Sequence, residues 1–143
     1  MKFRFPIVII DEDFRSENTS GLGIRALAQA IEVEGFEVVG VTSYGDMSQF
    51  AQQQSRASAF ILSIDDEEFS HGEDTDPVVL NLRSFIDEVR RKNSDVPIYI
   101  YGETKTSRHL PNDILRELHG FIHMFEDTPE FVARHIIREA KSY

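Results

Sequence analysis

Two apolar stretches of the chain end in clusters of carboxylates, and these carboxylates are the side chains best suited to chemistry. Asp11, Glu12 and Asp13 follow the run FPIVII, and Asp65 and Asp66 follow the run SAFILSI. Clustered carboxylates raise one another's pKa values unless a cation compensates, and their hard oxygens suit Mg²⁺. Asp11, Asp13 and Asp65 are therefore candidates for holding a divalent cation, for accepting a phosphoryl group, or for terminating strands and nothing more.

Which role applies depends on whether the two clusters meet in the fold. Apolar runs without a helical period predict buried strands, and runs with that period predict helices between them. The expected strands are Phe3–Ile10, Phe36–Val41, Ala59–Ile64, Val96–Tyr101 and Gly120–Phe125; the expected helices are Gly21–Glu34, Asp46–Ala57, Pro77–Lys92, Pro111–Leu118 and one from Pro129 to the last residue.

This alternation predicts an α/β fold, namely a flavodoxin-like or receiver-like three-layer sandwich around a five-stranded parallel sheet. The natural strand order for such a chain is 2-1-3-4-5. The first and third strands are then neighbours, and the carboxyl ends of parallel strands meet at one edge. Asp11, Asp13 and Asp65 are therefore expected to lie close together there.

The pattern of apolar residues also predicts which side chains form the core. In the helix Gly21–Glu34 the expected core stripe is Leu22, Ala26, Leu27, Ala30 and Ile31. Phe85 and Phe131 are expected on the core faces of their own helices. Tyr99 and Tyr101 alternate with isoleucines on the fourth strand, so one of them is expected to reach a partner surface.

The acidic rim is similar to that of phospho-acceptor receiver domains, but the remaining receiver chemistry is missing. A receiver needs a lysine just after its fifth strand, where this chain has His123, Met124 and Phe125. It also needs Ser or Thr at the end of its fourth strand, where Gly102 stands and Thr104 comes two residues late. The sequence therefore favours a solvated acidic rim over phosphoryl transfer, with weak divalent-cation binding left open.

Residues 21–26 read GLGIRA and match the G-x-G-x-x-A pattern of dinucleotide-binding folds. That motif requires a tight turn between strand and helix, whereas a long acidic loop precedes Gly21 here. The second strand also ends without an acid that could hold a ribose. We therefore expect the glycines to let the loop enter the helix rather than to bind a nucleotide.

Composition limits the remaining classes of function. The chain has 143 residues, no cysteine and a net charge of −10, from 25 acids and 15 bases. Thiol catalysis and cysteine-ligated metal sites are thus excluded. The acidity argues against partners such as nucleic acid or an anionic membrane. No stretch reaches the length of a membrane span, so a cytoplasmic location is expected.

Several segments together resemble the N-terminal domain of bacterial biodegradative arginine, lysine and ornithine decarboxylases. The segments that carry the likeness are FPIVIIDEDF, SAFILSIDDEE and HGFIHMFEDTPEF, and the likeness extends over the whole chain, most closely to the arginine decarboxylases. The resemblance implies that residues 1–143 are one receiver-like "wing" domain, expected to be a fragment of a longer chain.

The resemblance also implies that assembly and catalysis belong to different domains of the longer chain. In that family the wing precedes a large domain that binds pyridoxal phosphate, and it helps subunits assemble into homo-oligomers. Catalytic and cofactor-binding residues belong to the later domains, so none is expected in this chain, and its partners would be those domains and other subunits. The lysines stand in charged sequence contexts unlike a Schiff-base pocket: Lys2, Lys92, Lys105 and Lys141. The alternative is a stand-alone pseudo-receiver that binds a signalling partner without phosphorylation.

Overall fold

The computed structural model describes residues 5–42, 57–64, 76–92, 95–103, 109–123 and 126–142. Its centre is a five-stranded parallel sheet in the order β2-β1-β3-β4-β5. The strands are β1 (Ile7–Ile10), β2 (Val38–Val41), β3 (Ala59–Ser63), β4 (Ile98–Gly102) and β5 (Gly120–His123). The predicted fold class and strand order are therefore confirmed.

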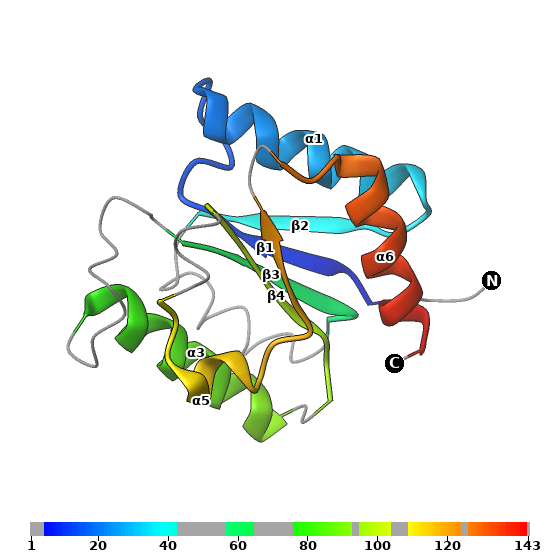
Figure 1. Ribbon diagram of the computed structural model, residues 1–143. Helices are drawn as coiled ribbons and strands as arrows, with labels where there is room; N and C mark the ends of the chain where they lie inside the picture. The colour runs from blue at the N-terminus through cyan, green and yellow to red at the C-terminus, as the bar shows by residue number, and fades with distance from the viewer. Residues whose placement is uncertain are drawn as a thin grey trace.

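Helices cover both faces of this sheet, as Figure 1 shows. Helices α1 (Thr19–Val33) and α6 (Pro129–Ser142) lie side by side on one face, and α3 (Pro77–Lys92) and α5 (Asn112–Leu115) lie on the other. Most of the predicted helix Asp46–Ala57 lies outside the described residues.

The alternation of side chains along each central strand divides the core into two layers. On β1, Ile7 and Ile9 join the cluster under α1 and α6, whereas Val8 and Ile10 join the cluster under α3. All four β1 residues are buried, as expected for a central parallel strand covered on both faces. Asp11 leaves β1 at the carboxyl edge of the sheet, between these two layers.

Tertiary packing corrects three expectations about the core. In α1 the buried residues are Gly21, Ile24, Leu27, Ala28 and Ile31, whereas Leu22 is 55% exposed. The reason is that α1 carries apolar residues on more than one face, and only one face can meet the sheet.

Phe131 is the second correction, because it is 70% exposed while Val132, Ala133 and Ile136 supply the core face of α6. The third concerns Tyr99 and Tyr101, which are both buried under α1 and α6, so neither is available to a partner. Both tyrosines point to the same face of β4, which is the covered one.

Candidate functional site

Asp11 is the best-defined member of the predicted acidic rim. It follows β1 directly and is only 5% exposed. One of its carboxylate oxygens accepts a hydrogen bond of 2.7 Å from the backbone N–H of Asp13. The hydroxyl of Ser63, the last residue of β3, donates a second hydrogen bond to the same side chain. Asp11 thus ties the end of β1 both to its own loop and to the neighbouring strand.

Burial dominates the ionisation of Asp11. Desolvation raises the pKa of this carboxyl above its ordinary value, and the hydrogen bonds from Asp13 and Ser63 oppose that rise, while the nearby charge of Asp13 adds to it. The effect extends to Tyr101, whose pKa is raised to about 12 by burial and by the negative charge of Asp11. Within the described chain the rim is therefore a partly desolvated acidic site.

Asp13, the second predicted residue, organises the loop that leads to α1. Its Oδ1 accepts hydrogen bonds from the Ser16 hydroxyl at 3.3 Å and from the Asn18 side-chain amide at 3.2 Å. Asn18 in turn caps α1, because its Oδ1 accepts from the Gly21 N–H at 2.8 Å. The structure thus brings Asp11 and Asp13 together and engages both in local hydrogen bonds.

The glycine of the nucleotide-like motif has a packing role in the same loop. A Cβ on Gly21 would overlap the carbonyl oxygens of Ser16 and Asp13, so only glycine allows the loop to lie this close to the helix. Arg25 closes the loop from the other side, because its Nη1 donates to the carbonyl oxygens of Phe14 and Ser16 at 2.8 and 2.7 Å. The loop is therefore held closely against the first turns of α1.

Asp65, the third predicted residue, lies outside the described residues, as do Asp66 and Thr104. Among the residues that are described, no group of three or more His, Asp or Glu side chains gathers into a metal site. The sequence did not identify Ser63, whose hydroxyl binds the Asp11 carboxylate. The parallel register pairs Ile10 with Leu62 and so brings the end of β3 beside Asp11, a contact that the sequence pattern alone does not specify.

The position that holds a lysine in receivers is organised differently here. His123 ends β5, and its backbone N–H donates to Asp127 Oδ2 at 2.8 Å. The His123 Nδ1 lies 3.5 Å from the same oxygen. His123 is thus tied to the loop that enters α6, and β4 ends in Gly102 where receivers place a hydroxyl.

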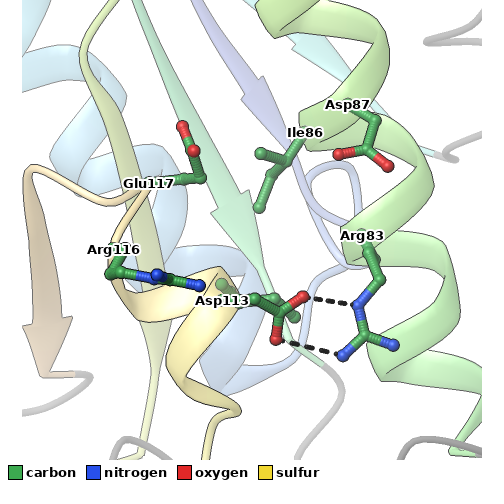
Figure 2. A pocket seen from close by; sticks show the side chains of 7 residues that line it. Arg83, Ile86, Asp87, Asp113, Arg116 and Glu117 are labelled. Carbon is green, nitrogen blue, oxygen red and sulfur yellow. Dashed lines mark hydrogen bonds and ion pairs between the residues drawn. The ribbon is translucent and has the colours of Figure 1, made fainter.

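A second candidate site is a cleft of about 400 Å³ between α3 and α5, shown in Figure 2. Its side chains combine an apolar floor with charged walls: Arg83, Ile86, Asp87, Asp113, Ile114, Arg116 and Glu117. Arg83 spans the cleft and binds the Asp113 carboxylate through Nε at 2.7 Å and Nη2 at 3.1 Å. This arginine lowers the pKa of Asp113.

A second arginine, Arg90, joins α3 to the turn that follows α5 and to the segment before β4. Arg90 Nε meets Glu117 Oε2 at 2.7 Å, and its two terminal nitrogens donate to the carbonyl oxygens of Val96 and Glu117, each at 2.9 Å. The cleft residues Arg83, Asp113 and Glu117 are therefore engaged in contacts within the domain, and the described residues of the cleft place no nucleophile next to a base.

Comparison with known families decides the broader assignment. Residues 19–143 match the model of the Orn/Lys/Arg decarboxylase N-terminal domain. The chain belongs to this family. It is 24% identical over 143 residues to lysine decarboxylase LdcA of Pseudomonas aeruginosa, and 24% identical over 139 residues to the biodegradative arginine decarboxylase of Escherichia coli K12. These alignments cover 98% and 96% of the chain but only 18% of each relative.

Solved structures show the same fold for members of this decarboxylase family and for receivers. Lysine decarboxylase A from P. aeruginosa superposes with a TM-score of 0.84 at 23% identity, over 99% of this chain and 19% of that one. The receiver domain of NtrX from Brucella abortus gives a TM-score of 0.65 at 14% identity, over 96% and 99% of the two chains. In the described part of the chain, no helix is both long and apolar enough to cross a membrane.

Proposed function

We propose that this chain is the non-catalytic N-terminal domain of a pyridoxal-phosphate-dependent amino-acid decarboxylase and that it serves subunit assembly and regulation. The observation that carries the proposal is the family match over residues 19–143, in a chain that spans about a fifth of its curated relatives. The described acidic residues support a structural role, because Asp11 and Asp13 are engaged in ordering the β1–α1 loop.

On this proposal the decarboxylation chemistry belongs to a cytoplasmic protein that extends beyond the wing. Its cofactor lysine and substrate pocket would lie in later domains, which are also the first partners of this chain. Arginine is the substrate we propose, in a pathway that consumes protons under acid stress, with lysine and ornithine as the competing substrates.

The test begins with the coding DNA beyond the Tyr143 codon. We expect an open reading frame of several hundred further codons that includes a lysine in a cofactor-binding context. The longer protein, expressed with pyridoxal phosphate, should release CO₂ from arginine faster than from lysine or ornithine. A stop codon directly after Tyr143 would contradict the proposal and favour a stand-alone pseudo-receiver.

A deletion then tests the assembly role separately from the chemistry. Removing residues 1–143 from the longer protein should reduce the size of its assemblies in sedimentation, while the cofactor still binds and shows its visible absorbance. Unchanged assemblies would refute the assembly role without touching the decarboxylase assignment. For the pseudo-receiver alternative, beryllofluoride with Mg²⁺ should leave the amide signals of Asp11 and Asp13 unchanged, whereas an active receiver would shift them.

A further inference from the structure

A stripe of four uncharged residues runs along the outward face of α1. Leu22, Ala26, Gln29 and Val33 are all exposed and follow one another at helical spacing. They lie opposite the buried stripe that contains Ile24, Leu27 and Ile31. Leu22 is 55% exposed and Val33 is 80% exposed, so two large apolar side chains stand at the two ends of this face. We call the four exposed residues the α1 stripe.

Such a face is unusual for this chain, in which 28% of the residues are charged. The corresponding outward face of α3 shows the contrast: its exposed Leu80 is accompanied by Asp87 and Arg91, which are also exposed. A molecule with a net charge of −10 repels copies of itself at most points of contact. The α1 stripe is a described surface where two copies could meet without bringing like charges together.

The spacing within the α1 stripe is the same when read in either direction. Two α1 helices that pack antiparallel about a twofold axis therefore place Leu22 of one copy opposite Val33 of the other, and Ala26 opposite Gln29. Gly23 and Ala30 flank the stripe and are small, which lets the two backbones approach closely. The large side chains then sit at the ends of the contact and the small ones near its centre.

The charges beside the stripe complement one another in the same arrangement. Arg25 and Glu32 lie on one flank of α1, along a shallow depression of about 630 Å³ that is also lined by Phe14 and Val33. In an antiparallel pair, the twofold axis places this flank of both copies on the same side of the helix–helix contact. Arg25 of one copy then comes close to Glu32 of the other, and the symmetry repeats the pair.

We propose that α1 packs antiparallel against α1 of a second copy of this chain, through the α1 stripe and its flanking Arg25 and Glu32. This inference rests on the proposed role in subunit assembly and names the surface that performs it. Figure 1 shows α1 on the outer side of its layer, with α6 beside it and the sheet beneath.

Disulfide cross-linking tests the arrangement cleanly, because the chain contains no cysteine. The variants Leu22→Cys and Val33→Cys are each oxidised alone and as a mixture. In the antiparallel pair the two sites face one another, whereas two copies of the same site are separated by roughly 16 Å along the axis, beyond the reach of a disulfide. We expect the mixture to form at least about tenfold more cross-linked dimer than either variant alone.

Two other outcomes overturn the proposal. Cross-linking of each variant with itself would indicate parallel packing, and no cross-link in the mixture at the highest soluble concentration would show that the stripe does not bind a second copy. If Leu22 then becomes protected in the longer protein, its own later domains cover the stripe instead. Either failure leaves the decarboxylase assignment intact, because CO₂ release by the longer protein is measured independently.

A charge placed on the stripe supplies a second measurement. Leu22→Glu and Val33→Glu should each weaken self-association in sedimentation by about tenfold or more, with an unchanged circular dichroism spectrum, because both side chains are exposed. Leu80→Glu on α3 is the matched control, since Leu80 is 50% exposed but lies on a charged face. Equal effects of all three variants would contradict a specific α1 interface.

Discussion

At the scale of single residues, the buried carboxylate of Asp11 has an observed structural role at the end of β1. It is fixed by the Asp13 N–H at 2.7 Å and by the Ser63 hydroxyl, and it sits at 5% exposure between two strands. Its charge has no described cationic partner within the rim. The carboxylate therefore joins two strand ends at an electrostatic cost.

The first prediction concerns Asp11→Asn. Burial raises the pKa of Asp11 in the folded state above its value in the unfolded chain. As the pH rises, the unfolded chain therefore releases this proton more readily than the folded chain does. Ionisation of Asp11 thus lowers the free energy of unfolding at neutral pH. Asn keeps an oxygen for the Asp13 N–H but cannot ionise. We expect the variant to be more stable than the parent at pH 7 and to lose that advantage below the ordinary Asp pKa near 3.8.

Urea unfolding of parent and variant across this pH range measures the effect. Asp13→Asn is the comparison in the same loop: it removes a charge that raises the Asp11 pKa but keeps the buried Asp11 carboxyl, so its gain in stability at pH 7 should be smaller. An advantage that grows as the pH falls would contradict the assigned direction of the pKa shift.

The second prediction concerns the Tyr99 hydroxyl, which is buried and finds no hydrogen-bond partner within the described chain. An unsatisfied buried hydroxyl costs about 1–3 kcal/mol, so Tyr99→Phe should leave stability unchanged or raise it by about 1 kcal/mol. Thermal unfolding tests this, with Tyr101→Phe as the comparison on the same face of β4. A loss of more than about 1 kcal/mol in Tyr99→Phe would reveal a partner for the hydroxyl.

At the scale of elements, the entry into α1 depends on a glycine rather than on a ligand. Gly21 lies inside the helix, where a Cβ would overlap backbone oxygens of the preceding loop. Asn18 and Arg25 hold the same loop through three hydrogen bonds of 2.7–2.8 Å. The loop and the first turns of α1 therefore form one unit.

The third prediction is that Gly21→Ala costs about 1–3 kcal/mol of stability, because backbone must move to admit the methyl group. Gly23→Ala is the matched control: Gly23 is partly exposed in the same helix, so alanine should stabilise it by up to about 1 kcal/mol through helix propensity. Denaturant unfolding measures both. Equal stability of the two variants would show that the close approach of the loop to Gly21 does not affect the free energy of unfolding.

The fourth prediction is that Arg83 and Arg90, the two arginines of α3 with partners outside the helix, contribute differently to stability. Arg90→Ala removes hydrogen bonds to two backbone carbonyl groups and should cost about 1–3 kcal/mol. Arg83→Ala removes the ion pair with Asp113, whose side chain is 44% exposed, and the loss of this pair should cost about 0.2–1 kcal/mol. Unfolding free energies test the order, and a larger loss for Arg83→Ala would reverse it.

At the scale of the whole molecule, charge and shape act against each other. A net charge of −10 makes copies of the chain repel one another, whereas the α1 stripe is the uncharged surface at which we propose that they associate. Protonation of carboxylates and of the five histidines reduces this repulsion as the pH falls. We therefore expect the proposed self-association through the α1 stripe to strengthen as the pH falls.

The fifth prediction follows: assemblies that contain this domain should be larger at pH 5 than at pH 8. Sedimentation of the longer protein at both values tests it, and added salt at pH 8 should imitate part of the acid effect by screening the charges. Identical assembly at pH 5 and pH 8 would refute the electrostatic account.

The sequence by itself determined the fold and the family. Buried strands such as Ile7–Ile10 and Ile98–Gly102 are short apolar runs without a helical period, and their alternation with helices predicts the parallel sheet. The order 2-1-3-4-5 is the usual one for a chain of five such units. The sequence also identified Asp11 and Asp13, because acids that follow a central strand must lie at the carboxyl edge.

Only the tertiary structure decided which faces and partners those elements use. The apolar residues of α1 surround most of the helix, so their spacing does not predict whether Leu22 or Ile24 is buried. In the structure Ile24 is buried against the sheet and Leu22 is exposed. The hydrogen bond between Ser63 and Asp11 joins residues that are far apart in the sequence. The close approach of Gly21 to Ser16 likewise has no sequence pattern that predicts it. A periodic pattern records how apolar a face is, whereas burial depends on what packs against it.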